Sequence, residues 1–306
     1  MTEISLRIGT RGSPLALAQT HEARRLLAVA NGCDESRFEI VVIRTSGDMI
    51  QDRPLSEAGG KGLFTKEIDA AMLNDEIDVA VHSSKDLPTF LPEGVTIAGY
   101  LPREDVRDAF ISARAGSLAA LPRGATLGTA SLRRLAQVKR LRPDIRAALL
   151  RGNVETRLRK AEAGEVDATL LAYAGLKRLG LAQRATALLD IDDFLPAVGQ
   201  GAIGLTARAN DAATRLALGR ILDVQTGAAL AAERAFLSIL DGSCRTPIAG
   251  HARVVAGRIA FHGMVLRADG SEVFEVKTAG AAVDAQRLGA EAGRDLLGRL
   301  PAGVLA

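Results

Sequence analysis

The sequence predicts an α/β protein with mainly parallel sheets, followed by a small α+β unit at the C-terminal end. Over the first two thirds of the chain, short β-rich runs alternate with helical patterns, an order typical of parallel strands joined through helices. After about Asp223 the pattern changes to one helix, three short strands and a final helix. With 306 residues, 47% of them hydrophobic, the chain can form two or three domains with cores of their own.

Capping residues, proline and glycine indicate where the helices and strands of the N-terminal third begin and end. A β-rich run over residues 6–8 precedes Ser13 and Pro14, which suit the N-cap and the first position of a helix. Gly32 ends this helix after about Ala30. We expect the next elements to be a strand over 38–45, a helix over 64–74 and a strand over 77–81.

The same alternation resumes in the middle of the chain. Strands are predicted over 126–128, 147–150 and 169–172, and helices begin at Ser131 and near Thr156. Breaks that contain proline, at 101–103 and 195–196, mark possible boundaries. The C-terminal unit is predicted to contain a helix over 226–240, strands around Ala252, Phe261 and Phe274, and a helix over 283–300.

Positive charge is concentrated in one stretch of the chain. The net charge is +3, but between Arg133 and Arg178 twelve Lys and Arg stand against five Asp and Glu, so 12 − 5 = +7. The rest of the chain therefore carries 3 − 7 = −4. Most of these cations are arginines, whose guanidinium groups bind carboxylate or phosphate through paired hydrogen bonds. The stretch predicts a local anionic ligand.

Composition narrows the class of protein. Cys33 and Cys244 are too few and too far apart for a disulfide framework, which favours a reducing, cytoplasmic location. No apolar run approaches the roughly 20 residues of a membrane-spanning helix, and we expect no secretory signal at the N-terminus. Aromatic residues make up only 3% and tryptophan is absent, which argues against a partner whose bases would stack on the protein. We therefore expect no membrane and no nucleic-acid partner.

Two segments in the N-terminal half place candidate functional groups at strand ends. Arg11 and Ser13 lie between a strand and a helix N-terminus, a position that favours a bound anion, although Ser13 could be only a cap and Arg11 solvated. Lys85 and Asp86 follow a hydrophobic strand, at the edge where open parallel sheets bind ligands. They could hold an anion and stabilise a developing cation, or form an ordinary ion pair. His82 beside them is more typical of a structural residue than of a base.

Arginines follow successive strands in the middle of the chain. Arg133 and Arg134 open a helix after one strand, Arg151 follows the next, and Arg178 lies slightly beyond the third. An arginine at a helix N-terminus is unfavourable unless an anion is present. Groups at the ends of parallel strands share one edge of the sheet, so this pattern predicts a polycarboxylate or phosphate site.

A glycine-rich connection lies between the early strands. Gly59, Gly60 and Gly62 surround Lys61, which indicates a mobile or closely approached backbone. The spacing of a P-loop is not met, so nucleotide hydrolysis is not predicted. The segment is either a lid over an active site or a surface loop without a role.

Cys244 lies in a tight loop after a helix, and the positive charge of Arg245 beside it would favour the thiolate. A lone cysteine is more often buried and inert, and composition does not choose between Cys244 and Cys33. Local sequence favours Cys244, because Cys33 between Gly32 and Asp34 has no neighbouring cation.

Together these motifs resemble the porphobilinogen deaminase family, in the same order along nearly the whole chain. One such match would be weak, whereas a complete ordered set is specific. The matching segments are 7–16 (RIGTRGSPLA), 59–64 (GGKGLF), 81–88 (VHSSKDLP), 128–134 (GTASLRR), 150–154 (LRGNV), 174–180 (AGLKRLG), 196–201 (PAVGQG) and 242–244 (GSC).

The resemblance implies a fold, an activity and a cofactor. Two domains built like the halves of periplasmic binding proteins, with mainly parallel mixed sheets, would take residues 1–101 with 198–221 and residues 102–197, and a third, α+β domain would take 222–306. The protein would be a monomeric, cytoplasmic transferase, a hydroxymethylbilane synthase, with no metal. It would condense four porphobilinogen molecules head to tail, with loss of ammonia, on a dipyrromethane cofactor held by a thioether to Cys244. Hydrolysis would then release hydroxymethylbilane.

The resemblance also implies roles for individual residues. Asp86 would be the catalytic carboxylate that stabilises the cation formed when ammonia leaves. Carboxylate groups of cofactor and substrate would be held by Arg11, Ser13, Lys85, Arg133, Arg134, Arg151, Arg157 and Arg178. Supporting hydrogen bonds would come from Ser83, Thr129, Ser131 and Gln200. Asp48, Lys61 and Phe64 would border a lid over residues 49–60.

The alternative function is that of a non-catalytic protein of the periplasmic type that binds a small oxyanion. Such a protein would share the fold and would also use helix N-termini and arginines. The expected lack of a secretory signal and the extra C-terminal unit with Cys244 count against this alternative.

Overall fold

The computed structural model describes residues 4–49, 62–240 and 246–305. The chain divides into two compact units. Unit 1 comprises Met1–Ile50, Lys61–Glu104 and Ala202–Gly227, and unit 2 comprises Gln51–Gly60, Asp105–Gly201 and Ala228–Ala306. The expected division into three domains remains a prediction.

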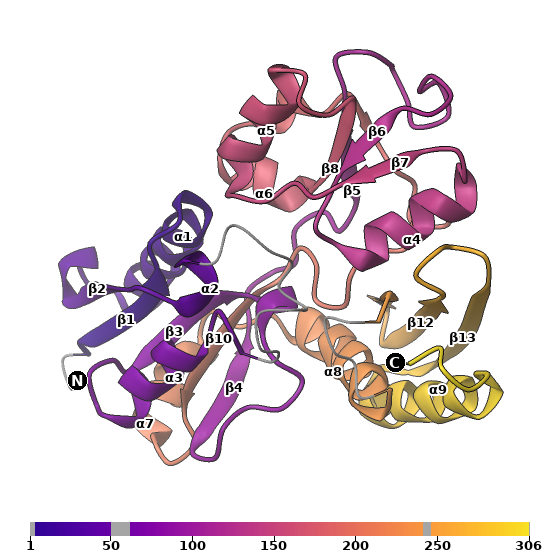
Figure 1. The fold of residues 1–306 in the computed structure, drawn as a ribbon. Coiled ribbons are helices and arrows are strands. Elements are labelled where there is room, and N and C mark those ends of the chain that lie inside the picture. Colours follow the sequence, from indigo (N-terminus) through magenta and orange to yellow (C-terminus); the bar gives the residue numbers. More distant parts are fainter. Residues whose placement is uncertain (1–3, 50–61, 241–245, 306) are drawn as a thin grey trace. The chain divides into compact units, whose positions relative to one another are not determined.

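Unit 1 is built on a five-stranded sheet with the order β2-β1-β3-β10-β4 (Figure 1). Strands β1, β2 and β3 are parallel, whereas β10 runs antiparallel to both of its neighbours. The strands are β1 (Leu6–Arg11), β2 (Phe38–Ile43), β3 (Val79–Ser83), β4 (Val95–Tyr100) and β10 (Ile203–Arg208). The helices are α1 (Pro14–Asn31), α2 (Ser46–Met49), α3 (Lys66–Leu73) and α7 (Ala212–Gly219).

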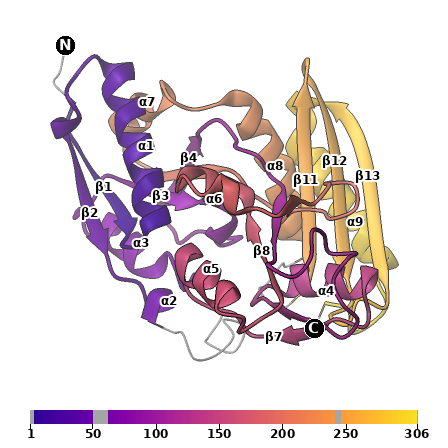
Figure 2. The same ribbon diagram turned by 90° about the horizontal axis from the view of Figure 1, so that it is seen from above.

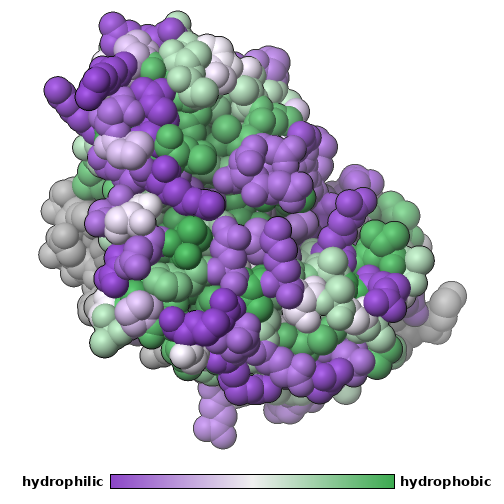
Figure 3. Space-filling model, turned by 90° about the vertical axis from the view of Figure 1, so that its right-hand side faces the viewer, coloured by the Kyte–Doolittle hydropathy of each residue, from purple (hydrophilic) through white to green (hydrophobic). Residues whose placement is uncertain are grey.

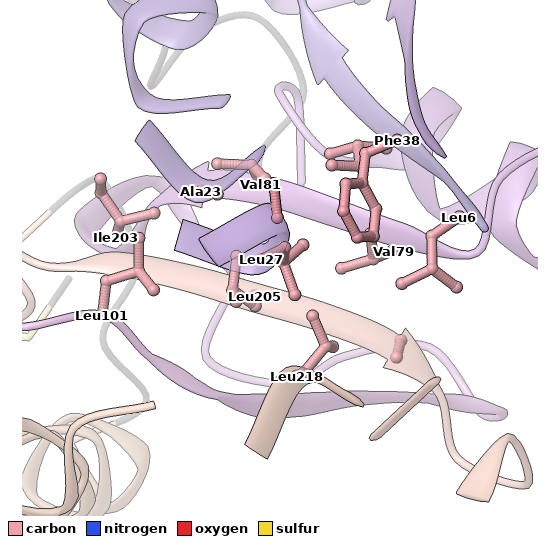
Figure 4. Packing of buried hydrophobic residues seen from close by; sticks show 13 residues of the cluster. Leu6, Ala23, Leu27, Phe38, Val79, Val81, Leu101, Ile203, Leu205 and Leu218 are labelled. Carbon is pink, nitrogen blue, oxygen red and sulfur yellow. The ribbon is translucent and has the colours of Figure 1, made fainter. Parts of the chain in front are cut away.

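Helix α1 has the ends that its sequence predicts and packs its apolar face on the sheet. Ser13 Oγ accepts a hydrogen bond from Ala16 N at 3.3 Å, and Gly32 closes the helix in the left-handed region, with φ 63°. Ala23 and Leu27, one turn apart, lie against Leu205 and other buried strand residues (Figure 4). Each such leucine stabilises the fold by about 1.5–3 kcal/mol through burial. This packing holds the start of α1 beside the end of β1.

Unit 2 contains a second five-stranded sheet, with the order β7-β6-β8-β5-β9. Its pattern matches that of unit 1, because three parallel strands, β7, β6 and β8, lie beside an antiparallel strand, β5. The elements are β5 (Asp108–Ile111), β6 (Thr126–Gly128), α4 (Leu132–Leu141), β7 (Arg146–Ala148), α5 (Val154–Glu162), β8 (Ala168–Ala172), α6 (Tyr173–Arg178) and β9 (Ala187–Leu188). The predicted pair of mainly parallel mixed sheets is confirmed.

A three-stranded antiparallel sheet with two helices forms the C-terminal part, as predicted (Figure 2). It comprises α8 (Val224–Ile239), β11 (Ile248–Val255), β12 (Arg258–Leu266), β13 (Val273–Ala281) and α9 (Ala285–Arg299). The two helices pack closely, because a Cβ at Gly289 would lie 2.0 Å from the carbonyl oxygen of Ala232. Met264 and Leu266 of β12 pack in one hydrophobic cluster with Ala136 of α4. The apolar residues of the sheet therefore continue into the core beside α4.

The strands that the sequence did not predict are β4, β5, β9 and β10. Of these, β5 and β10 pair with strands far away along the chain, which local periodicity cannot indicate. None of the helices within the described ranges is both long and apolar enough to cross a membrane. On the face of the molecule displayed in Figure 3, hydrophilic and hydrophobic residues are interspersed, as on ordinary protein surfaces.

Candidate active site

Three charged side chains of unit 1 meet at the edge formed by the carboxyl ends of β1, β2 and β3. Arg11 is the last residue of β1, Asp48 lies in α2 after β2, and Asp86 lies in a single 3-10 turn after β3. Arg11 Nε donates to Asp48 Oδ2 at 3.1 Å, and Arg11 Nη2 also donates to Asp48. Arg11 Nη1 lies 3.6 Å from Asp86 Oδ2. The structure thus brings together three of the residues predicted from the sequence.

The ion pair of Asp48 with Arg11 orients the guanidinium group. Thr45 Oγ1 donates to Asp48 Oδ2 at 2.8 Å, so the carboxylate is fixed from two sides. Burial alone would raise the pKa of Asp48, but the hydrogen bonds from Arg11 and Thr45 outweigh it and lower that pKa. One guanidinium group thus faces two carboxylates, and these three side chains have a formal charge of 1 − 2 = −1.

Phe64 covers the other face of Arg11. The guanidinium carbon lies 4.0 Å from the centroid of the Phe64 ring, a cation–π geometry. The ring can take this position only because residue 47 is glycine, since a Cβ there would lie 2.5 Å from the ring. Phe64, predicted at the margin of a lid, is thus in direct contact with the charged cluster.

Ser83, Ser84 and Lys85 lie beside Asp86 at the end of β3. Ser83 Oγ donates to Oε1 of Gln19, a buried residue of α1. Sequence reasoning missed Gln19, although position 19 continues the buried stripe of Ala23 and Leu27 at intervals of four, where a polar residue is unusual. Ser84 Oγ is buried and has no partner among the described residues, and Lys85 is exposed.

His82 is buried rather than directed into the charged cluster. Its Nε2 forms a hydrogen bond of 3.1 Å with Thr206 Oγ1 of β10. Burial, and to a smaller extent the charge of Arg11, lowers the pKa of His82 to about 4. The structure therefore favours a structural role for His82.

The second charged cluster lies in unit 2, at the carboxyl edge of β6, β7 and β8. Ser131 caps α4 by accepting from Arg134 N at 3.4 Å, and its own N–H donates to Thr129 Oγ1 at 3.1 Å. This arrangement places Arg133 and Arg134 in the first turn of α4, directly after β6. The strands are parallel, so the predicted sharing of one sheet edge is confirmed.

Arg133 and Arg134 both bind Asp108, the first residue of β5. Arg134 donates to Asp108 Oδ1 from Nε at 3.0 Å and from Nη2 at 2.7 Å, and Arg133 Nη2 donates to Oδ2 at 2.8 Å. Gln200 Nε2 also donates to Asp108, at 3.2 Å. Burial alone would raise the pKa of Asp108, but the two guanidinium groups outweigh it and hold that pKa well below its ordinary value. Sequence reasoning missed Asp108, whose signal is a single acid in the apolar strand Asp-Ala-Phe-Ile.

The remaining predicted arginines are half-buried on elements that follow β7 and β8. Arg151 follows β7, and Arg157 Nε of α5 donates to Asn153 O at 3.3 Å. Arg178, the last residue of α6, donates from Nη2 to Gly201 O at 3.1 Å. They lie after the strands that the sequence predicted, and their ligand roles remain predictions.

Some predicted residues lie outside the described residues. These are Cys244, Lys61 and residues 50–60 of the expected lid. Their roles as cofactor anchor, lid margin and lid therefore remain predictions. Met49, the first residue of that segment, is the last residue of α2.

The two five-stranded sheets share one pattern of parallel strands, and each has charged groups at its carboxyl edge. This arrangement is typical of an α/β protein that binds a charged small molecule. Residues 6–216 match the family model described as porphobilinogen deaminase, dipyromethane cofactor binding domain, and residues 228–298 match the model of the porphobilinogen deaminase C-terminal domain. The chain belongs to the porphobilinogen deaminase family.

Two bacterial porphobilinogen deaminases agree with this membership. Porphobilinogen deaminases of Nitrobacter winogradskyi and Nitrobacter hamburgensis are each 59% identical over 295 residues, which cover 96% of this chain and 93% of the relative. Among solved structures, a periplasmic substrate-binding protein of an ABC transporter from Coxiella burnetii is similar with a TM-score of 0.45 and 12% identity, over 71% of this chain and 91% of its own.

Membership in the family confirms the expected enzyme class, a transferase of the hydroxymethylbilane synthase type. The expected dipyrromethane cofactor is also confirmed, since the larger matching domain is defined by binding it. The alternative of a non-catalytic oxyanion-binding protein is not favoured.

Proposed function

We propose that this chain joins four porphobilinogen molecules head to tail, with loss of ammonia, on a dipyrromethane primer attached to Cys244. The observation that carries the proposal is the opposite formal charge of the two clusters. In unit 1, Arg11 faces two carboxylates, whereas in unit 2, two arginines share the carboxylate of Asp108. The first arrangement suits a cation that forms during reaction, and the second suits a ligand rich in carboxylates.

The residues of unit 2 fit a carboxylate-bearing cofactor. Arg133 and Arg134 against Asp108 leave a formal charge of 2 − 1 = +1 at the start of α4, where the helix dipole adds positive potential. Arg133 Nε is buried and has no acceptor among the described residues. When bound, the dipyrromethane would supply the pyrrole carbon to which the first substrate molecule is joined.

Asp86 would act on the substrate. The amine departs with the electrons of its carbon–nitrogen bond and leaves as ammonia after protonation, so the pyrrole that remains is an azafulvene cation. The carboxylate of Asp86 would contact the pyrrole N–H groups and stabilise that cation. It would also take part in proton transfer. A carbon–carbon bond then forms to the growing chain, and the attacked pyrrole loses one proton.

The other predicted residues would hold substrate and cofactor. Ser83, Thr129, Ser131 and Gln200 would support them with hydrogen bonds, and Asp48, Lys61 and Phe64 would border the lid. The carboxylates would be held by Arg11, Ser13, Lys85, Arg133, Arg134, Arg151, Arg157 and Arg178. The location and oligomeric state predicted from the sequence, a cytoplasmic monomer, belong to the same proposal.

Intact mass spectrometry tests the proposal directly. The purified protein should be heavier than its polypeptide by two linked pyrroles, should colour with acidic Ehrlich's reagent, and should gain discrete increments after brief incubation with porphobilinogen. Cys244→Ser should abolish the added mass and the activity. Cys33→Ser is the matched control, because it removes the other cysteine, which lies just past the end of α1, and it should keep both.

A mass equal to that of the bare polypeptide, after expression with a supply of tetrapyrrole precursors, would overturn the cofactor proposal. Retained turnover in Cys244→Ser would overturn only the proposed attachment of the cofactor to Cys244. Protein that carries the pyrroles but adds no substrate would show binding without the proposed reaction.

A further inference from the structure

The buried carboxylate of Asp108 belongs to none of the ligand-binding roles proposed above. Asp108 has 0% exposure and begins the strand Asp-Ala-Phe-Ile, whose other residues are apolar and buried. A carboxylate in such a place is costly unless it is paired and hydrogen-bonded. Its partners, Arg133 and Arg134, are the two arginines at the start of α4. The acid therefore determines where two guanidinium groups of the predicted ligand site point.

Arg133 is held at both ends of its guanidinium group. Nη2 donates to Asp108, and Nη1 donates to Leu195 O at 2.7 Å. The same carbonyl accepts from Gln137 Nε2 at 3.0 Å, and Leu195 N donates to Gln137 Oε1 at 2.8 Å. Arg133 thus ties the start of α4 to β5 and to the segment around Leu195, and it has little freedom to move.

Arg134 is held along one side only. Both Nε and Nη2 donate to Asp108 Oδ1, while Nη1 forms no hydrogen bond with a described residue. Unlike Arg133 Nε, this nitrogen is not among the fully buried atoms without a partner, and the Arg134 side chain as a whole is 7% exposed. It lies on the first turn of α4, where an anion also gains from the helix dipole.

We propose that Asp108 is a positioning residue, which holds Arg133 and Arg134 so that Arg134 Nη1 points at a carboxylate of the pyrrole ligand. Asp108 neutralises one of the two buried positive charges and leaves the other for the ligand. The role rests on the proposed function, because the ligand is taken to be the dipyrromethane or the porphobilinogen chain built on it. Without Asp108, two adjacent guanidinium groups would repel each other and lose their common orientation.

A double-mutant cycle between Asp108→Asn and Arg134→Gln tests this role. The readouts are the fraction of protein that carries the pyrrole mass, KM and kcat for porphobilinogen, and thermal unfolding. We expect each single variant to raise KM at least tenfold or to cut cofactor loading by a similar factor. If Asp108 acts through Arg134, the double variant should be no more than threefold worse than Arg134→Gln. A merely structural acid would instead multiply the two effects.

Two further variants keep the test decisive. Asp108→Glu retains the charge but displaces both guanidinium groups by the length of one methylene, so it should raise KM even if Asp108→Asn fails to fold. Asp144→Asn is the matched control: Asp144 pairs with Arg142 Nε and Nη2 at 2.8 Å, at the other end of α4. It should leave KM within twofold of the wild-type value.

Unchanged KM and cofactor loading in folded Asp108→Asn or Asp108→Glu would overturn the positioning role, and so would independent effects in the cycle. Those results would leave the proposed function intact, provided that the wild-type protein carries the pyrrole mass and turns over. Wild-type protein that carries no pyrroles would instead contradict the proposed function itself.

Discussion

The charged clusters of the two units differ in both exposure and the sign of their charge. In unit 1 the side chains of Arg11, Asp48 and Asp86 are 19%, 33% and 32% exposed, and acids outnumber bases. In unit 2 the side chains of Asp108, Arg133 and Arg134 are 0%, 6% and 7% exposed, and bases outnumber acids. Equivalent edges of the two sheets, each formed by three parallel strands, therefore carry three-residue clusters of opposite formal charge.

The difference teaches how one architecture serves two tasks. In the proposed function Asp86 stabilises a short-lived cation and has to reach the reacting atoms, and its side chain is 32% exposed beside Arg11. Asp48 holds Arg11, and Thr45 in turn holds Asp48. A group that holds a persistent anion binds it more tightly when its side chain is already oriented and shielded from water. In the role proposed above, Asp108 supplies that orientation in unit 2.

The largest effect is expected from Asp86→Asn. Loss of the negative charge should lower kcat by about 10³-fold, about 4 kcal/mol in activation free energy, because the cation loses its main stabiliser. The dipyrromethane should remain attached, which intact mass would show. Asp75→Asn, at an exposed carboxylate of the same unit, should leave kcat unchanged. Turnover near the wild-type rate in Asp86→Asn would remove Asp86 from the chemistry.

Arg133→Leu should break the buried cluster of unit 2. The change removes the donor of the buried Asp108 Oδ2 and leaves Leu195 O with Gln137 Nε2 alone, so the free energy of unfolding should fall by about 3 kcal/mol. Cofactor loading should fall with it. Denaturant unfolding would measure the loss against Arg114→Leu, which removes an exposed ion pair and should cost at most about 1 kcal/mol. Equal losses in the two variants would contradict the contrast between buried and exposed pairs.

His82 should make the stability of unit 1 depend on pH. Its pKa is lowered from 6.5 to about 4 in the folded protein, so below pH 6.5 the unfolded chain binds a proton that the folded chain does not. Stability should therefore fall as the pH drops, by about 2 kcal/mol between pH 7.5 and pH 5. His82→Gln should flatten that slope in denaturant unfolding, whereas substitution of the exposed His21 should not. An identical slope in His82→Gln would show that other groups cause it.

The smallest effect is expected from Asp48→Asn. Arg11 would lose the nearer of its two charged partners but keep Asp86 and Phe64 as neighbours, so we expect about a tenfold loss in kcat, about 1.4 kcal/mol. Steady-state kinetics would measure it, with Thr45→Val as a milder variant that leaves the ion pair in place. A gain in rate would mean that Asp48 restrains Arg11 rather than orienting it for catalysis.

The sheet edges could be predicted from the sequence because their signals are local. The Ser-Pro start of α1, the Ser131 cap of α4 and the alternation of strands and helices are each contained in a few residues, and they place Arg11, Asp86, Arg133 and Arg134 correctly at strand ends. The ion-pair partner of Arg133 and Arg134 could not be predicted in this way. The arginines on α4 indicated an external anion, but β5 brings Asp108 to them from 25 residues away along the chain.

Strand β10 has a consequence for how the protein is made. It lies between β3 and β4, yet it is translated after the whole of the second sheet, whose strands all fall within Asp105–Gly201. While the ribosome is still short of residue 203, β4 has no neighbour in its own sheet, whereas the inserted sheet is already complete. The later sheet can therefore finish folding before the earlier one, and the nascent N-terminal segment has to wait with unpaired strand edges that invite aggregation.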